Sequence, residues 1–192
     1  MKPKNSKMAP KSPKIRVENI VASTAIADEL DLHEIARLIE DAEYEPEQFP
    51  GLVYRISEPK TATLLFKSGK ANCTGAKTLA GVEETIKKIT QGLKDVGIKV
   101  YDKPSIVIQN MVATYDLQAE LDLNAIALNL GLENVEYEPE QFPGLVYRIP
   151  DLRVVILLFG SGKIVCTGAR KNEDIENAIK RVQEALRGID AL

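Results

Sequence analysis

The segment YEPEQFPGLVYRI occurs twice in this chain of 192 residues, at residues 44–56 and again at residues 137–149. The two copies are identical at every position, including the charged ones. A buried core tolerates hydrophobic substitutions that keep its volume and pattern, so packing alone does not require identical charged residues. The repeated segment therefore indicates an internal duplication and a surface that the protein uses twice.

The duplication extends to both sides of this segment. Three further pairs of segments match: VENIVAST (17–24) with IQNMVATY (108–115), ELDLHEIA (29–36) with ELDLNAIA (120–127), and LLFKSGKANCTGAK (64–77) with LLFGSGKIVCTGAR (157–170). The unit of about 90 residues is longer than the roughly 20 to 50 residues of a solenoid repeat. We therefore expect two half-domains related by a pseudo-two-fold axis, at residues 15–100 and 101–192.

Charged residues are segregated along the chain, although the net charge is only −3. Residues 28–47 contain nine acidic residues and one basic residue, and residues 116–140 contain seven acidic residues and no Lys or Arg. Residues 55–77 and 148–171 each contain five basic residues and one acidic residue. Because the local field governs binding, the folded protein could present a basic surface despite its negative total charge.

Residues 1–14 contain five lysines, three prolines and no apolar stretch. This composition predicts a basic flexible tail rather than a secretory signal. The sequence contains no run of about 18 apolar residues, the length needed for a membrane span. We therefore expect a soluble, intracellular protein.

Each repeat shows the same predicted order of a strand, a helix, several strands and a long helix. In the first repeat the expected elements are a strand at 14–23, a helix at 31–41, short strands at 51–57, 61–68 and 71–74, and an amphipathic helix at 77–97 that ends near Gly97. Runs of strands flanked by helices indicate an α+β fold, with an antiparallel sheet and its helices on one face.

Strand alternation predicts which side chains point away from the helices. Ile20, Leu65 and Cys73 fit the covered side of the sheet. Their neighbours then lie on the uncovered face: Asn19, Val21, Leu64, Phe66, Asn72 and Thr74, and in the second repeat Asn110, Val112, Leu157, Phe159, Val165 and Thr167. An uncovered face this apolar, bordered by Lys and Arg, predicts a binding surface.

The doubled motifs EPE-x-FPGLVYRI, LLF-x-SGK and TGA[KR], with the QN-x-V-A-T-like openings of the repeats, closely resemble the TATA-box-binding protein family over residues 15–188. The near-symmetric repeats and the short tail are similar to archaeal members. The resemblance implies a saddle, in which a curved antiparallel sheet grips the DNA minor groove with its concave side and carries its helices on the convex face.

The resemblance also implies a general transcription initiation factor. Such a protein binds and kinks A·T-rich promoter DNA, the TATA box, and recruits transcription factor B and RNA polymerase. It would be cytoplasmic and nucleoid-associated in an archaeon, or nuclear in a eukaryote. No cofactor is implied.

The four phenylalanines of the chain occupy equivalent positions: Phe49 and Phe66 in the first repeat, Phe142 and Phe159 in the second. The resemblance makes each pair a wedge that enters between base steps and kinks the duplex, a mechanism for which TATA-box-binding proteins are themselves the type example. Ordinary core aromatics are the alternative.

Base contacts are expected from the middle of the face. Val21, Val112, Leu64, Leu157 and Val165 would tolerate A·T pairs and crowd the guanine amine, which protrudes only at G·C pairs. Asn19, Asn110, Thr74 and Thr167 can donate hydrogen bonds to the A and T acceptors. Asn72 stands where the second repeat has Val165, and it is either a contact of looser selectivity or a residue near a turn.

Phosphate contacts are expected at the rim of the face. The candidates are Arg55, Ser68, Lys70 and Lys77 in the first repeat, and Arg148, Ser161, Lys163 and Arg170 in the second. By resemblance, the loop with Glu138 and Glu140 binds transcription factor B, whose basic surface would complement these carboxylates. Glu45 and Glu47 repeat the same letters in the first repeat.

An enzyme and a protein-interaction scaffold are the two alternative classes of function. No carboxylate pair, activated nucleophile or metal-ligand cluster recurs between the repeats, so neither an enzyme nor a metal site is expected. Cys73 and Cys166 lack metal-ligand spacing and are expected to be buried free thiols. A protein-interaction scaffold that uses the apolar face is the stronger alternative.

Overall fold

The computed structural model describes residues 14–131, 133–149 and 151–192, so the predicted tail, apart from Lys14, lies outside the described residues. The first repeat contains β1 (Arg16–Ala25), α1 (Leu32–Leu38), β2 (Ala42–Glu43), β3 (Leu52–Ile56), β4 (Thr61–Leu65), β5 (Lys70–Ala76) and α2 (Leu79–Asp95). The second repeat has the same order: β6 (Ile106–Asp116), α3 (Leu123–Leu130), β7 (Val135–Glu136), β8 (Leu145–Arg148), β9 (Val155–Leu158), β10 (Lys163–Ala169) and α4 (Asn172–Gly188).

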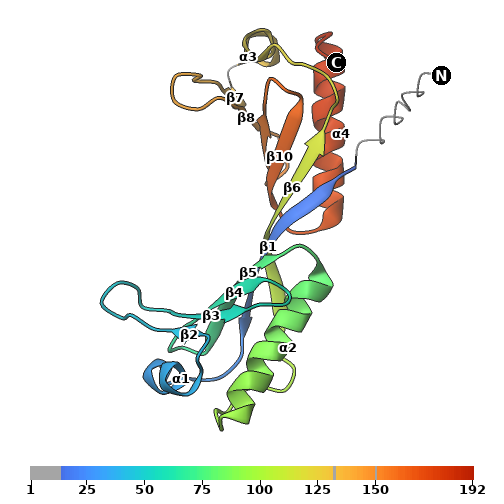
Figure 1. Ribbon diagram of the computed structural model, residues 1–192. Helices are drawn as coiled ribbons and strands as arrows, with labels where there is room; N and C mark the ends of the chain where they lie inside the picture. Colours follow the sequence, from blue (N-terminus) through green and yellow to red (C-terminus); the bar gives the residue numbers. More distant parts are fainter. Residues whose placement is uncertain (1–13, 132, 150) are drawn as a thin grey trace, which may run out of the picture.

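The ten strands of the described residues form one antiparallel sheet in the order β2-β3-β4-β5-β1-β6-β10-β9-β8-β7. Helices α2 and α4 lie along the same side of this sheet, and the loops that lead into β3 and β8 extend away from them (Figure 1). The predicted α+β saddle, a curved antiparallel sheet with helices on its convex face, is confirmed.

The two repeats join where β1 pairs with β6. Ile20 lies opposite Met111, and on either side of this pair Asn19 faces Val112 and Val21 faces Asn110. Because the same residue types exchange places about this point, the pseudo-two-fold axis passes close to Ile20 and Met111. The sheet is therefore continuous from one repeat into the other.

Helix boundaries follow from local capping. Asp31 caps α1 by accepting a hydrogen bond from the Glu34 N–H at 3.0 Å. This helix ends at Leu38, three residues before the predicted boundary, because Ile39 already has extended backbone angles. At the end of α2, Gly97 has φ +85°, and the N–H groups of Gly97 and Ile98 return to carbonyls of the last turn. This Schellman motif explains why the helix stops next to the predicted glycine.

Two strands were not expected from the sequence. β2 and β7 contain two residues each and pair with β3 and β8 at the outer edges of the sheet. A strand of two residues is too short to show the alternation by which strands are recognised. Their positions matter because they carry Glu43 and Glu136 onto the edge of the uncovered face.

The core lies between the sheet and its helices. Ile20, Leu65 and Cys73, which were predicted to face the helices, are at most 1% exposed. Both cysteines are buried and free, as predicted. Burial raises the pKa of the Cys166 thiol to about 12, so this thiol stays protonated at neutral pH. Among the described residues, no helix is long and apolar enough to span a membrane.

The core of the first repeat is more polar than that of the second. Four buried threonines, Thr61, Thr63, Thr85 and Thr90, lie in the first repeat where the second has Val154, Ile156, Ala178 and Gln183. The Thr61 and Thr85 hydroxyls bond to each other at 3.1 Å, and Thr85 donates to the Gly81 carbonyl at 2.7 Å. The Thr63 hydroxyl has no nitrogen or oxygen partner among the described residues and lies beside the Cys73 thiol, a weak partner.

Thr63→Val is expected to raise the free energy of unfolding by about 1 kcal/mol, because it removes a buried hydroxyl without a strong partner. The matched change in the second repeat, Ile156→Thr, should lower it by about 1 to 3 kcal/mol, because it buries a new hydroxyl. Urea unfolding of both variants measures the difference. A loss of stability in Thr63→Val would show that its hydroxyl contributes a favourable bond.

Candidate nucleic-acid interface

Cross-strand pairing brings the predicted contact residues into two rows on the uncovered face. Residues directly opposite in an antiparallel pair share a face, so each chain of partners follows one side of the sheet. The first-repeat row contains Glu43, Val53, Leu64, Asn72, Ser23 and Val107. The second-repeat row contains Glu136, Val146, Leu157, Val165, Thr114 and Arg16. The sheet therefore aligns equivalent residues of the two repeats.

Asn72 is part of a strand rather than of a turn. It lies within β5, opposite Ser23 on one side and Leu64 on the other. Its side chain is exposed, whereas its neighbours Ala71 and Cys73 are fully buried. The reading of Asn72 as a turn residue is therefore wrong, and the asymmetry with Val165 lies on the uncovered face.

A network of hydrogen bonds fixes the amide of Asn19 and, in the same way, that of Asn110. The Asn19 Oδ1 accepts from the Gly75 N–H at 2.8 Å, and its Nδ2 donates to the Thr74 hydroxyl at 3.2 Å. Asn110 makes the same bonds to Gly168, at 2.7 Å, and to Thr167, at 3.3 Å. Each amide thus has its oxygen occupied and keeps one N–H to donate to a ligand.

This network requires glycine at its centre. Gly75 and Gly168 have φ +100° and +94°, a region that other residues rarely adopt. A Cβ on Gly168 would lie 2.3 Å from the Arg153 carbonyl oxygen, and one on Gly75 would lie 2.9 Å from the Lys60 oxygen. The TGA[KR] motif therefore positions the two asparagines.

The phenylalanines form two pairs outside the core. Phe49 and Phe66 meet edge to face with ring centroids 6.2 Å apart, and Phe142 and Phe159 do so at 5.9 Å. Phe49 and Phe142 remain 40% and 38% exposed. In both repeats the N–H of the loop phenylalanine bonds at 3.0 Å to the carbonyl of the glutamate four residues earlier. The alternative of ordinary core aromatics is therefore wrong.

Three of the six cations predicted at the rim are in ion pairs. Arg55 lies 3.2 Å from Glu43, and Arg148 lies 3.2 Å from Glu136. Lys77 lies 3.2 Å from Glu18. Lys70, Lys163 and Arg170 form no ion pair among the described residues. Exposed pairs contribute only about 0 to 1 kcal/mol, so a phosphate can compete for the paired cations.

Ser68 and Ser161 lie in the turns that follow the second phenylalanine of each pair. The N–H of Phe66 bonds to the Lys70 carbonyl at 2.9 Å, and that of Phe159 bonds to the Lys163 carbonyl at 3.0 Å. Both serines are exposed. The turns thus hold a hydroxyl and a cation next to each phenylalanine pair.

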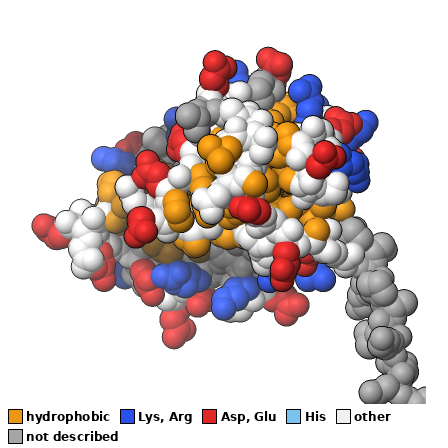
Figure 2. All heavy atoms as spheres, turned by 90° about the horizontal axis from the view of Figure 1, so that it is seen from above, with side chains coloured by type: hydrophobic (Ala, Val, Ile, Leu, Met, Phe, Trp, Pro, Cys, Tyr) orange, Lys and Arg blue, Asp and Glu red, His pale blue; other side chains and the backbone are white. Residues whose placement is uncertain are grey.

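The acidic loop residues Glu138 and Glu140 are also exposed, like Glu45 and Glu47 in the first repeat. Their carboxylates lie on the loop that carries Phe142. Figure 2, which looks onto the end of the molecule with the second repeat, shows acidic side chains among apolar ones.

Sequence reasoning missed several residues of the uncovered face. Val53 and Val146 occupy the rows between the outer strands and Leu64 or Leu157. Alternation could have predicted them. Val53 is two residues before Arg55 in β3, and residues two apart in a strand point to the same side of the sheet. Arg16, Thr114 and Glu18 were also missed, since their positions depend on the pairing of β1 with β6.

Glu18 introduces a negative charge near the centre of this face. Its carboxylate accepts from Lys77 at 3.2 Å and from the Thr114 hydroxyl at 3.0 Å. These two bonds, with the charge of Lys77, lower the pKa of Glu18, so it is ionised at neutral pH. The equivalent residue of the second repeat is the neutral Gln109, which donates to the Ser23 hydroxyl at 2.7 Å.

Comparison with known proteins agrees with this geometry. The family model described as "Transcription factor TFIID (or TATA-binding protein, TBP)" matches residues 14–96 and 105–189. The TATA-box-binding protein of Thermoplasma acidophilum is 61% identical over 176 residues, which cover 92% of this chain and 96% of that protein. The TATA-box-binding protein of Archaeoglobus fulgidus is 55% identical over 174 residues, covering 91% and 95%.

A solved structure, titled Methanococcus jannaschii TBP, has the same fold. It matches with a TM-score of 0.85 and 55% sequence identity, over 91% of this chain and 99% of that one. The predicted resemblance to archaeal members is thereby confirmed. Two matches of one family model, in order along a duplicated chain, place this protein among transcription factors: it belongs to the TATA-box-binding protein family.

Proposed function

We propose that this protein is a general transcription initiation factor that binds the minor groove of an A·T-rich promoter box with its uncovered face and kinks the DNA at both ends. The observation that carries the proposal is the pair of phenylalanines outside the core at each end of an apolar face, with Phe49 and Phe142 exposed. The names of the relatives support the same ligand, since they are TATA-box-binding proteins.

Preference for A·T pairs follows from the middle of the face. Its aliphatic residues would crowd the guanine amine, which A·T pairs lack. The fixed amides of Asn19 and Asn110 each present an N–H, which suits the N3 and O2 acceptors of A and T. TA-containing steps also deform easily, which favours the same sequences without direct contact.

Kinking is the proposed role of the phenylalanine pairs. Burying one phenylalanine stabilises a complex by about 1.5 to 3 kcal/mol, while unstacking a base step costs a few kcal/mol. Two rings at each end thus match the cost of one kink. Their edge-to-face contact holds the rings together before DNA arrives.

Asn72 makes base readout unequal in the two halves. Its amide can accept a hydrogen bond from the guanine amine, whereas Val165 can only crowd it. The half contacted by the first repeat should therefore discriminate less strongly against G·C pairs.

Recruitment of transcription factor B and RNA polymerase is the second part of the proposal. The loop with Glu138 and Glu140 is exposed and acidic, which suits a basic partner surface. Because the two repeats carry the same loop residues, the surroundings of the loop must decide which one a partner selects.

Competition between A·T-rich and G·C-rich duplexes of equal length tests the DNA part of the proposal. We expect a preference for the A·T-rich duplex of about 10³-fold or more, in the range of specific DNA binding.

Phe142→Ala with Phe159→Ala should abolish the bend at one end while the fold is kept, since these rings lie outside the core. Fluorescence energy transfer between the DNA ends measures the bend. Equal binding of the two duplexes would favour a protein-interaction scaffold instead.

Gly144→Ala is expected to reduce DNA bending because it displaces the two phenylalanine rings, without other changes to the protein. A Cβ on Gly144 would lie 2.7 Å from the Phe142 Cε1 and 3.0 Å from the Phe159 Cε1, so the pair must move. Gly51→Ala is the matched change in the first repeat, with 2.6 Å to Phe49 and 3.0 Å to Phe66. Each variant should reduce the bend at its own end and keep the unfolding temperature. An unchanged bend in both would mean that the position of the rings is not critical.

Glu138→Arg with Glu140→Arg should abolish binding of transcription factor B to the protein–DNA complex without weakening DNA binding. Glu45→Arg with Glu47→Arg, the same change in the first repeat, should have much less effect. Gel-shift titration of the complex with the partner separates the two steps. Equal losses from both double variants would show that the loop alone does not select the partner.

A further inference from the structure

The two rows differ in charge where they reach the central strands. The second-repeat row ends in Arg16 of β1, and the first-repeat row ends in Val107 of β6. Both side chains are exposed, that of Val107 by 52%. The pseudo-two-fold axis therefore relates a cation on one half of the uncovered face to an apolar residue on the other.

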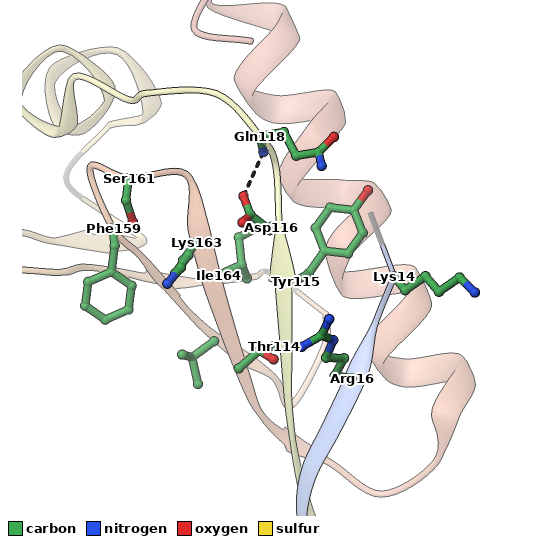
Figure 3. Close-up of a pocket in the computed structure, with 11 residues that line it drawn as sticks. Lys14, Arg16, Thr114, Tyr115, Asp116, Gln118, Phe159, Ser161, Lys163 and Ile164 are labelled. Carbon is green, nitrogen blue, oxygen red and sulfur yellow. Dashed lines mark hydrogen bonds between the residues drawn. The ribbon is translucent and has the colours of Figure 1, made fainter. Parts of the chain in front are cut away.

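Arg16 lies in a hollow suited to an anion. The hollow has a volume of about 1020 Å³ and is lined by Arg16, Lys14, Lys163, Ser161 and Phe159, among others. Figure 3 shows the Arg16 guanidinium beside Thr114, with Lys163 and Phe159 across the hollow. Asp116 is the one carboxylate among the described lining residues. Three cations and a hydroxyl next to a proposed wedge fit the DNA backbone.

The equivalent positions of the first repeat carry less positive charge. Lys14 corresponds to Ser105 and Arg16 to Val107, so only Lys70 remains of the three cations. Nearer the centre, Glu18 holds Lys77 in an ion pair, whereas Gln109 leaves the equivalent Arg170 without a carboxylate at that position. Both differences strengthen the second-repeat half as a phosphate-binding surface.

We propose that Arg16 binds a DNA phosphate at the second-repeat end only, so that a bound duplex is held more tightly at this end than at the other. This inference rests on the proposed DNA binding. According to this inference, the two halves bind DNA with unequal strength, although the fold makes them nearly equivalent. The guanidinium is suited to this role because its planar donors match phosphate oxygens.

The salt dependence of affinity for an A·T-rich duplex tests the contact. Arg16→Gln should reduce the log–log slope by about 0.9, the contribution of one phosphate. Val107→Arg, at the symmetric position, should increase the slope by a similar amount. Lys87→Gln, which removes an exposed cation from α2 on the opposite side of the sheet, should leave it unchanged.

Combining Arg16→Gln with removal of the phenylalanine wedges tests at which end of the face Arg16 contacts the DNA. The effect of Arg16→Gln on affinity should shrink when Phe142 and Phe159 are changed to alanine, because contacts at one end are coupled. It should stay unchanged when Phe49 and Phe66 are removed instead. An unaltered slope in Arg16→Gln, or equal coupling to both ends, would overturn the inference.

These results separate the inference from the function on which it rests. If the unmodified protein shows no preference for the A·T-rich duplex, the proposed function fails. If it binds with that preference while Arg16→Gln keeps the original slope, only the role of Arg16 fails.

Discussion

The antiparallel pairing of β1 with β6 is the constraint on which the rest of the structure depends. It turns two half-sheets into one sheet and sets Ile20 against Met111 at the pseudo-two-fold axis. The register of this pair decides which residues of the two repeats share a face, because a shift by one residue would exchange the two sides of a strand. The placement of Asn19, Asn110 and Arg16 on the uncovered face follows from it.

The sheet is covered on one side only, and this leaves its other side for a ligand. All four helices of the described residues contribute buried side chains to the core on the covered side. A protein that leaves Val, Leu and Phe partly or fully exposed on a face without a partner loses the stability that their complete burial would give. The buried threonines of the first repeat, by contrast, reduce the apolar content of the core itself. The two repeats therefore have the same fold, but the burial of their cores contributes differently to stability.

Local periodicity predicted much of the fold, because alternation depends only on neighbouring residues. It placed Ile20, Leu65 and Cys73 on the covered side and Leu64 and Asn72 opposite, and capping residues located the end of α2. It could not predict contacts that depend on sheet register. Glu18 meets Lys77 across 59 positions of sequence, and Glu43 reaches Arg55 through a strand too short to be recognised. The sequence thus predicted which residues lie on the uncovered face, but not which of its cations form ion pairs.

The two-residue strands at the ends of the sheet have a consequence for solubility. An open sheet offers unpaired N–H and C=O groups at its edges, where another chain can add a strand and start aggregation. Here each edge strand provides only a short ladder, and each carries a glutamate, Glu43 in β2 and Glu136 in β7. Growth of the sheet by addition of further copies is therefore discouraged at both edges. A protein with a large apolar face can in this way remain dispersed while that face stays open to a ligand of matching curvature.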